Sequence, residues 1–190
     1  MNSVGLKIKN NEPLIFIHTP KCGGTYVAQI LKDLNIKNKG HKQAIKNEGI
    51  TFTIIRDPIQ RFESLLNYRL GEIKPRTDWP KHLKHVYEDK SITLNEIVSK
   101  MSDNEIKGFT PYKTLTYWTQ NVNIIITINK LPQLLNFFNY YYDINKYEIK
   151  NVSTKIRGKL NDQTKERLKK IFKDDLILFN KINGNQLLKK

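Results

Sequence analysis

The chain has 190 residues and a formal net charge of +15, because 33 Lys and Arg residues outnumber 18 Asp and Glu residues. Hydrophobic residues make up 38% of the sequence, which excludes a disordered chain and fits a single globular domain over 1–190. No apolar run approaches the ~20 residues of a membrane-spanning helix. The polar residues 1–11 do not resemble a secretory signal, and the single cysteine excludes an internal disulfide. We therefore expect a soluble chain with no membrane span, cytoplasmic if it is full length.

The positive charge has two interpretations. It favours binding of an anionic ligand. It also follows from a sequence that is rich in Lys, Asn and Ile throughout, in which case most lysines are solvated surface residues. A nucleic-acid-binding protein would show a basic stripe with interleaved aromatic residues or a known module. The sequence shows neither, so we expect no nucleic-acid partner.

The first predicted elements are a buried strand at 14–17, a loop with glycines, and a helix whose apolar residues recur at helical spacing over 27–34. This order of elements binds phosphate in many proteins, because the helix start offers unpaired N–H groups and glycines let an oxyanion approach the backbone. Lys21 adds a full positive charge. The lysine precedes Gly23 and Gly24, so the loop differs from a Walker A sequence.

A second strand is predicted at 52–55, and Arg56 follows it at the strand end. Asp57 suits the N-cap of a helix, and Pro58 suits its first position. Three polar residues of this helix stand at i, i+3 and i+7 and therefore share one face, which we expect to bind an anion. These residues are Arg61, Ser64 and Tyr68.

The alternation of strands and helices predicts an α/β protein, a P-loop-like three-layer fold with a central parallel sheet flanked by helices. A polar connection is expected over 35–49, a short helix over 94–101, and a third buried strand over 124–128 followed by a helix from 130. Ligands of such sheets bind at the carboxyl ends of the strands. Both loops described above fall there.

At these residues the chain resembles the sulfotransferases that use 3′-phosphoadenosine 5′-phosphosulfate (PAPS), and most closely their carbohydrate and membrane-type branch. Pro20–Thr25 is similar to the family's 5′-phosphosulfate loop, and Arg56–Ser64 is similar to its 3′-phosphate motif. The resemblance implies an enzyme that transfers a sulfuryl group from PAPS to an acceptor hydroxyl without a metal and releases adenosine 3′,5′-bisphosphate (PAP). A saccharide is the favoured acceptor, and a protein tyrosine or a small alcohol stays open. The implied cofactor-binding residues are Pro20, Lys21, Cys22, Gly23, Gly24, Thr25, Tyr26, Arg56 and Ser64.

A late Asn-Val-Ser segment at 151–153 is similar to a family segment that precedes a loop closing over the cofactor. The resemblance makes Ser153, Lys155 and Arg157 further cofactor candidates. The alternative interpretation is a solvated basic loop.

Other polar residues are predicted to be structural. His82 and His85 could share a helix face, but without a third ligand we expect surface residues rather than a metal site. His18 is expected to be structural or to face adenosine. A last helix is expected to begin at 161–162. The adjacent carboxylates at 174–175 are interpreted as a solvated helix end.

Sulfuryl transfer resembles phosphoryl transfer, in which the protein positions the reactants and neutralises developing charge. Lys21 is placed to stabilise the leaving oxygen. His41 is the first candidate for the general base, because imidazole titrates near neutral pH and several carbohydrate sulfotransferases have a Gly-His segment here. Glu48 and Glu63 stay open as alternatives, with Glu63 disfavoured because it lies on a separate helix face. Cys22 is expected to be a small loop residue rather than a nucleophile.

Two other functions stay open. A P-loop kinase or NTPase would require Mg²⁺ and a lysine after the glycines, which the sequence lacks. A non-catalytic PAP-binding protein would bind PAP tightly and show no turnover with any acceptor.

Overall fold

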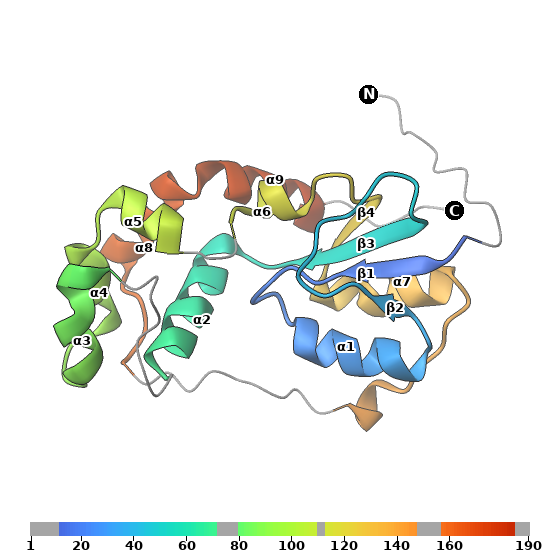
Figure 1. Ribbon diagram of the computed structural model, residues 1–190, viewed down its shortest axis with the longest axis horizontal. Coiled ribbons are helices and arrows are strands. Elements are labelled where there is room, and N and C mark those ends of the chain that lie inside the picture. The colour runs from blue at the N-terminus through green and yellow to red at the C-terminus, as the bar shows by residue number, and fades with distance from the viewer. Residues whose placement is uncertain (1–11, 72–79, 110–112, 148–156, 185–190) are drawn as a thin grey trace.

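A four-stranded parallel sheet lies at the centre of the described part of the chain (Figure 1). The structure is a computed structural model that describes residues 12–71, 80–109, 113–147 and 157–184. Its strands pair in the order β2-β1-β3-β4, and every pair is parallel. The predicted α/β class with a central parallel sheet is confirmed. The strands are β1 (Leu14–Ile17), β2 (Lys37–Asn38), β3 (Ile50–Ile55) and β4 (Ile124–Thr127).

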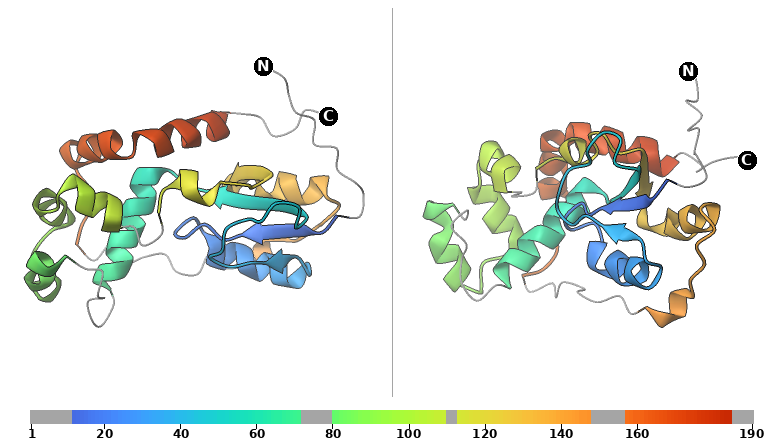
Figure 2. Two further views of the ribbon diagram at one scale, coloured as in Figure 1. Left: turned by 45° about the horizontal axis from the view of Figure 1, so that its top comes forward. Right: turned by 45° about the vertical axis from the view of Figure 1, so that its right-hand side comes forward.

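Helices flank this sheet (Figure 2). Phe16 and Phe52 point to one face, where they share a buried cluster with residues of α1 and α7. On the opposite face Ile15 and Ile17 pack against Ala44, which belongs to the connection before β3. α9 contacts both β4 and α6. The bounds of these helices are α1 (Gly24–Asp33), α6 (Leu115–Trp118), α7 (Leu131–Phe137) and α9 (Lys173–Gly184).

A second buried cluster lies beyond the carboxyl ends of the strands, where β3 leads into α2 (Figure 1). Phe62, Leu65 and Leu66 of α2 are fully buried there, as their helical spacing predicts. Leu168 and Phe172, near the carboxyl end of the chain, complete the cluster. Its helices are α2 (Pro58–Leu70), α3 (Lys84–Glu88), α4 (Leu94–Lys100), α5 (Asp103–Phe109) and α8 (Asp162–Ile171), and short 3-10 turns occur at Lys81–Leu83, Ile128–Lys130 and Ile144–Lys146.

The predicted helix starts agree with the structure. Asp57 caps α2, since its side chain accepts hydrogen bonds from the backbone N–H groups of Ile59 and Gln60, each at 2.9 Å. Pro58 occupies the first helical position. Asn161 caps α8 through a 2.8 Å hydrogen bond from the N–H of Thr164. Local sequence therefore sets the start of two helices of the second buried cluster.

Three features differ from the prediction. The expected polar connection over 35–49 contains β2, whose two exposed residues carry no apolar pattern. A further helix, α9, follows α8. Asp174 is exposed as expected, but Asp175 is only 3% exposed and its carboxylate accepts backbone hydrogen bonds from α6. The expected solvated carboxylate pair is therefore wrong for Asp175, because α6 packs over it.

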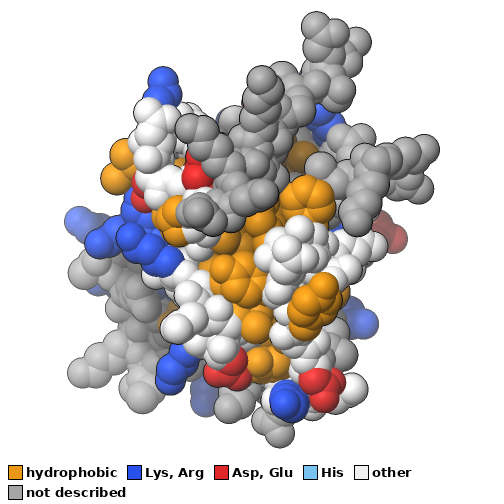
Figure 3. All heavy atoms as spheres, turned by 90° about the vertical axis from the view of Figure 1, so that its right-hand side faces the viewer, with side chains coloured by type: hydrophobic (Ala, Val, Ile, Leu, Met, Phe, Trp, Pro, Cys, Tyr) orange, Lys and Arg blue, Asp and Glu red, His pale blue; other side chains and the backbone are white. Residues whose placement is uncertain are grey.

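One end of the molecule carries hydrophobic side chains at its surface (Figure 3). This face lies opposite the helical cluster and away from the carboxyl ends of the strands. In the part of the chain that is described, no helix is both long and apolar enough to cross a membrane.

Candidate functional site

The two predicted ligand loops lie against each other. They follow β1 and β3, which are neighbours in the parallel sheet, so both loops leave the same edge. Arg61 belongs to the helix after the second loop, and its Nε donates a 3.0 Å hydrogen bond to the carbonyl oxygen of Pro20 in the first. Thr19 and Thr53 also contact each other, with 2.7 Å between their hydroxyl oxygens. The structure thus brings together two segments that are more than thirty residues apart.

The first loop has a strained backbone. Lys21 has a φ of 62° and Gly23 a φ of 86°, both in the left-handed region that favours glycine. Gly23 is the N-cap of α1, and as a glycine it has no side chain to accept a hydrogen bond from the first turn. The first turn of α1 contains no acidic residue. This helix end therefore keeps N–H groups and a partial positive charge at the loop.

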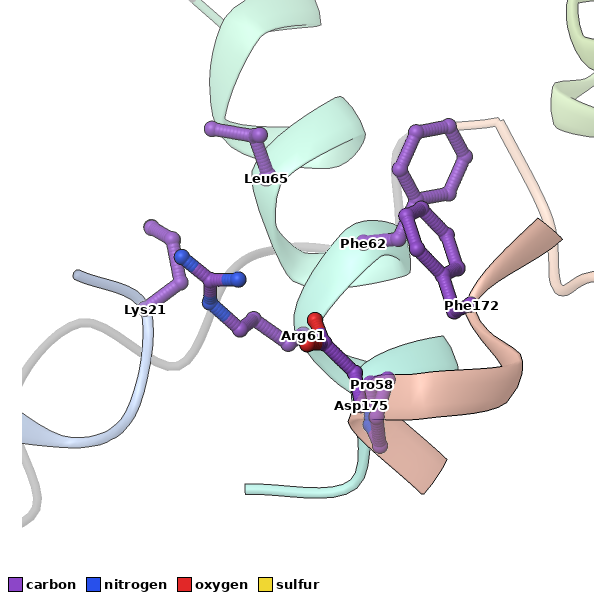
Figure 4. A pocket seen from close by; sticks show the side chains of 7 residues that line it. All are labelled: Lys21, Pro58, Arg61, Phe62, Leu65, Phe172 and Asp175. Atoms are coloured by element: carbon purple, nitrogen blue, oxygen red, sulfur yellow. The ribbon is translucent and has the colours of Figure 1, made fainter. Parts of the chain in front are cut away.

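Lys21 is half-buried against α2. Its Nζ lies 4.2 Å from the centre of the Tyr68 ring, a cation–π contact. Lys21 and Arg61 line one small pocket, and Figure 4 shows the Arg61 guanidinium directed toward the loop that carries Lys21. The structure therefore places two cations and a tyrosine at the meeting point of the two loops. The other residues that line the pocket are Pro58, Phe62, Leu65, Phe172 and Asp175.

The face of α2 that was expected to bind an anion is divided in the structure. Tyr68 is exposed and Ser64 is half-buried, but Arg61 is only 5% exposed and donates to backbone carbonyl oxygens. Arg61 therefore has a structural role here, because it links α2 to the backbone at Pro20 and Lys113. Arg56 is exposed at the end of β3, and its Nε lies 3.4 Å from Oε1 of Gln60. Arg56 and Ser64, the two residues that were expected to hold the 3′-phosphate, are therefore both accessible to a ligand.

Cys22 is buried beneath the loop. Burial raises the pKa of its thiol to about 11, although the nearby Arg61 and Arg56 act in the opposite direction. The thiol donates to the carbonyl oxygen of Pro20, with 3.6 Å between sulfur and oxygen. A neutral, buried thiol is a poor nucleophile. This agrees with the prediction that Cys22 is a small loop residue. Gly23 and Thr25, in the same loop, are exposed.

β2 brings His41 to the first loop. Backbone hydrogen bonds join Lys39 to Phe16 at 2.9 Å and His18 to Gly40 at 3.1 Å, so the pairing of β1 and β2 continues past both strands. The ring of His41 then meets the edge of the His18 ring, with 4.3 Å between their centres. His41 is exposed on its other side. The sequence contained no signal for β2. The proximity of His41 to the first loop could therefore not be predicted from the sequence.

Both histidines are neutral at pH 7. Burial, followed by the proximity of His41, lowers the pKa of His18 to about 4. Partial burial also lowers the pKa of His41 below its ordinary value. A neutral imidazole can accept a proton, so His41 is in the form that a general base requires. His18 is half-buried, and its ring packs against that of His41.

The two alternative bases have less suitable surroundings. Glu48 forms a 2.6 Å ion pair with Lys39 and accepts a 2.6 Å hydrogen bond from the N–H of Ile45. Although burial acts to raise its pKa, these two partners hold the pKa of Glu48 below its ordinary value, so this carboxylate is a weak base. Glu63 is half-buried, and one of its carboxylate oxygens is buried without a hydrogen-bond partner among the described residues.

The remaining cofactor candidates differ in their placement. Tyr26 is half-buried on α1 and packs against the core of the sheet, near Tyr142 and Tyr147. Arg157 is only 6% exposed, and it donates to the carbonyl oxygens of Val86 at 2.6 Å and Asp89 at 2.8 Å. Arg157 therefore joins the end of α3 to the segment that precedes α8, and α3 lies on the far side of α2 from α1 (Figure 1). Ser153 and Lys155 lie outside the described residues.

No cluster of potential metal ligands occurs among the residues that the structure describes. His82 and His85 are both exposed, and the ring of His82 lies 3.4 Å from a carboxylate oxygen of Glu105. The predicted surface placement of these two histidines agrees with the structure.

Gly24 has a structural role that the phosphate-loop pattern does not reveal. A Cβ atom at this position would lie 1.8 Å from Nε2 of His18, so the histidine ring occupies the space that a side chain would need. We expect Gly24→Ala to displace His18 and to lower the free energy of unfolding by about 1–3 kcal/mol. Urea denaturation measures this change.

Gly108 provides a matched control for Gly24. It lies in a helix, and outside that helix no atom of the described residues is within 4 Å of the place that a Cβ atom would take. Gly108→Ala should therefore leave stability unchanged or raise it by up to ~1 kcal/mol. His18→Ala should remove most of the penalty of Gly24→Ala, as a double-mutant cycle would show. Equal stability of Gly24→Ala and the unsubstituted protein would contradict the contact.

Comparison of this chain with protein-family models, with curated proteins and with solved structures gives no match in any of the three.

Proposed function

We propose that this protein is a PAPS-dependent sulfotransferase that acts on a hydroxyl group, with a saccharide as the favoured acceptor. The observation that carries the proposal is the contact between the two loops, made by Arg61 and the carbonyl oxygen of Pro20 at 3.0 Å. Each loop resembles the motif for one charged end of PAPS. A nucleotide with two anionic ends requires both motifs at one edge of the sheet, and the strand order supplies this.

The residues at this edge fit the anionic groups of PAPS. The N-cap of α1 is a glycine without a capping side chain, which leaves backbone donors for the 5′-phosphosulfate. Lys21 adds charge beside this helix end. Exposed Arg56 and half-buried Ser64 would hold the 3′-phosphate. Within this proposal the strand, loop and helix at 14–33 form a P-loop-like unit whose lysine precedes its glycines.

The proposed reaction is an in-line transfer. The acceptor oxygen forms a bond to sulfur while the bond from sulfur to the 5′-phosphate oxygen breaks, and PAP leaves with the electron pair. Lys21 stabilises the charge that develops on the leaving oxygen. His41 accepts the proton of the acceptor hydroxyl. In this scheme the protein positions the reactants and neutralises charge, as in phosphoryl transfer.

The resting contacts of Lys21 and His41 suit these roles. Lys21 rests over the ring of Tyr68 and can leave this cation–π contact, worth about 0.5–1 kcal/mol at an exposed site. His41 packs against the half-buried ring of His18 and is itself exposed to solvent. An acceptor hydroxyl can therefore approach His41 from solvent.

A ligand-binding experiment tests the proposal. PAP should raise the melting temperature, because it binds the native state, and 5′-AMP and ATP should raise it much less. Arg56→Ala should weaken PAP binding by about 10- to 100-fold, which is the loss expected for one charge-assisted contact. It should leave the small effect of 5′-AMP unchanged, because 5′-AMP has no 3′-phosphate.

Lys84→Ala is a suitable control for Arg56→Ala, since Lys84 is exposed on α3 and distant from both loops. It should leave the response to PAP unchanged. An equal response to PAP and 5′-AMP in the unsubstituted protein would refute the 3′-phosphate site. Tight PAP binding without turnover across glycans, tyrosine peptides and small alcohols would favour a non-catalytic PAP-binding protein.

A further inference from the structure

α6 is a single helical turn that residues from other elements hold at its start. Asp175 of α9 accepts hydrogen bonds from the N–H of Leu115 at 2.9 Å and from the N–H and hydroxyl of Thr116 at 3.3 and 3.1 Å. These contacts give hydrogen-bond partners to a carboxylate that is only 3% exposed. The position of α6 is therefore set by contacts between distant segments.

Arg61 joins this helix to the first loop. Its guanidinium donates through Nε to the carbonyl oxygen of Pro20 at 3.0 Å and through a terminal nitrogen to that of Lys113 at 3.1 Å. Pro20 precedes Lys21 in the loop, and Lys113 lies two residues before α6. The rigid fork of a buried guanidinium can bridge two carbonyl groups at once, which a lysine ammonium on a flexible chain does poorly.

The end of α6 holds the segment that carries His41. The side-chain amide of Gln43 donates to the carbonyl oxygen of Tyr117 at 3.1 Å and lies 3.3 Å from Oε1 of Gln120. The ring of Trp118 lies 6.4 Å from that of His41, centre to centre. Both ends of this short helix are therefore tied to segments of the candidate site.

We propose that Arg61 is a positioning residue, which holds His41 in place relative to Lys21 by fixing α6 between the first loop and the segment that carries His41. The contacts form a closed path from the first loop through Arg61 to α6, from α6 through Gln43 to His41, and from His41 through His18 back to the first loop. The effect on turnover rests on the function proposed above. The effect on the surroundings of His41 does not.

The experiment compares Arg61→Lys with Arg167→Lys. Arg167 is a matched control, because its guanidinium also bridges two backbone carbonyl oxygens, those of Val98 at 2.8 Å and Met101 at 2.6 Å, away from both loops. The first readout is the titration of the His41 ring protons by NMR, with the resonance assigned from His41→Gln. The second readout is turnover, measured well below the melting temperature of each variant.

We expect Arg61→Lys to loosen α6, to reduce the remaining burial of the His41 ring, and to move the pKa of His41 upward toward the ordinary value of about 6.5. Turnover should fall by about 10- to 100-fold, since small misplacements of a catalytic group have effects of this size. PAP should still raise the melting temperature. Arg167→Lys should lower the melting temperature but leave the titration of His41 and the turnover within twofold of the unsubstituted protein.

Gln43→Leu keeps the proposal testable if Arg61→Lys does not fold, because it cuts the path at its far end without altering a buried charge. It should produce the same upward shift in the titration of His41. An unchanged titration in the folded variants, or an equal shift in Arg167→Lys, overturns the role of Arg61. If Arg61→Lys or Gln43→Leu shifted the titration of His41, but the unsubstituted protein neither bound PAP nor transferred a sulfuryl group, the positioning role would be supported and the proposed function refuted.

Discussion

Replacement of Lys21 by alanine should lower the rate of sulfuryl transfer by about two to three orders of magnitude, the loss expected when a donor to the developing charge is removed. PAP binding should weaken far less, because PAP lacks the sulfuryl group and has no bridging oxygen to sulfur. Alanine is a suitable replacement, because Lys21 is itself a non-glycine residue with a φ of 62°. The substitution therefore adds little backbone strain at this position. Transfer from labelled PAPS and PAP-dependent melting measure the two effects.

Lys32→Ala is the control for this prediction. Lys32 is an exposed lysine in the last turn of α1, at the opposite end of the helix that begins at the loop. It should change neither transfer nor PAP binding. If Lys21→Ala reduced PAP binding as strongly as it reduced transfer, Lys21 would be a contact for the nucleotide and not a stabiliser of the leaving oxygen.

Replacement of His41 by glutamine should lower turnover by about two to four orders of magnitude, which is the contribution of a positioned general base. The active form is the neutral imidazole, and protonation at low pH removes it. In the unsubstituted protein kcat/KM should therefore rise with pH through the pKa of His41, which burial holds below 6.5, and should level off above it. His41→Gln should abolish this rise and leave PAP-dependent melting unchanged.

His82→Gln is the matched control, because His82 is an exposed histidine that lies beside Glu105, far from the loops. Its pH profile should match that of the unsubstituted protein. Persistence of the same rise in His41→Gln would assign the base to another group. A rise centred near pH 4 would indicate His18, whose pKa is lowered to about 4.

Local sequence was sufficient for several elements. The apolar runs at 14–17 and 52–55 became neighbouring parallel strands, and Asp57 and Pro58 set the start of α2. Caps and buried strands depend on residues close together in the chain, so a local pattern contains the information. The position of both loops at one edge followed from the parallel order of the strands.

The sequence by itself thus determined the α/β class, the two loops and the residue types available to bind an anion. The tertiary structure alone decided what Arg61, His41 and Asp175 contact. Arg61 meets carbonyl oxygens 41 and 52 positions away, and Asp175 meets N–H groups about 60 positions away. β2 carries His41 to His18 through backbone hydrogen bonds, which are available to any side chain and leave no apolar pattern. These contacts depend on packing between distant segments, and a short stretch of sequence does not encode them.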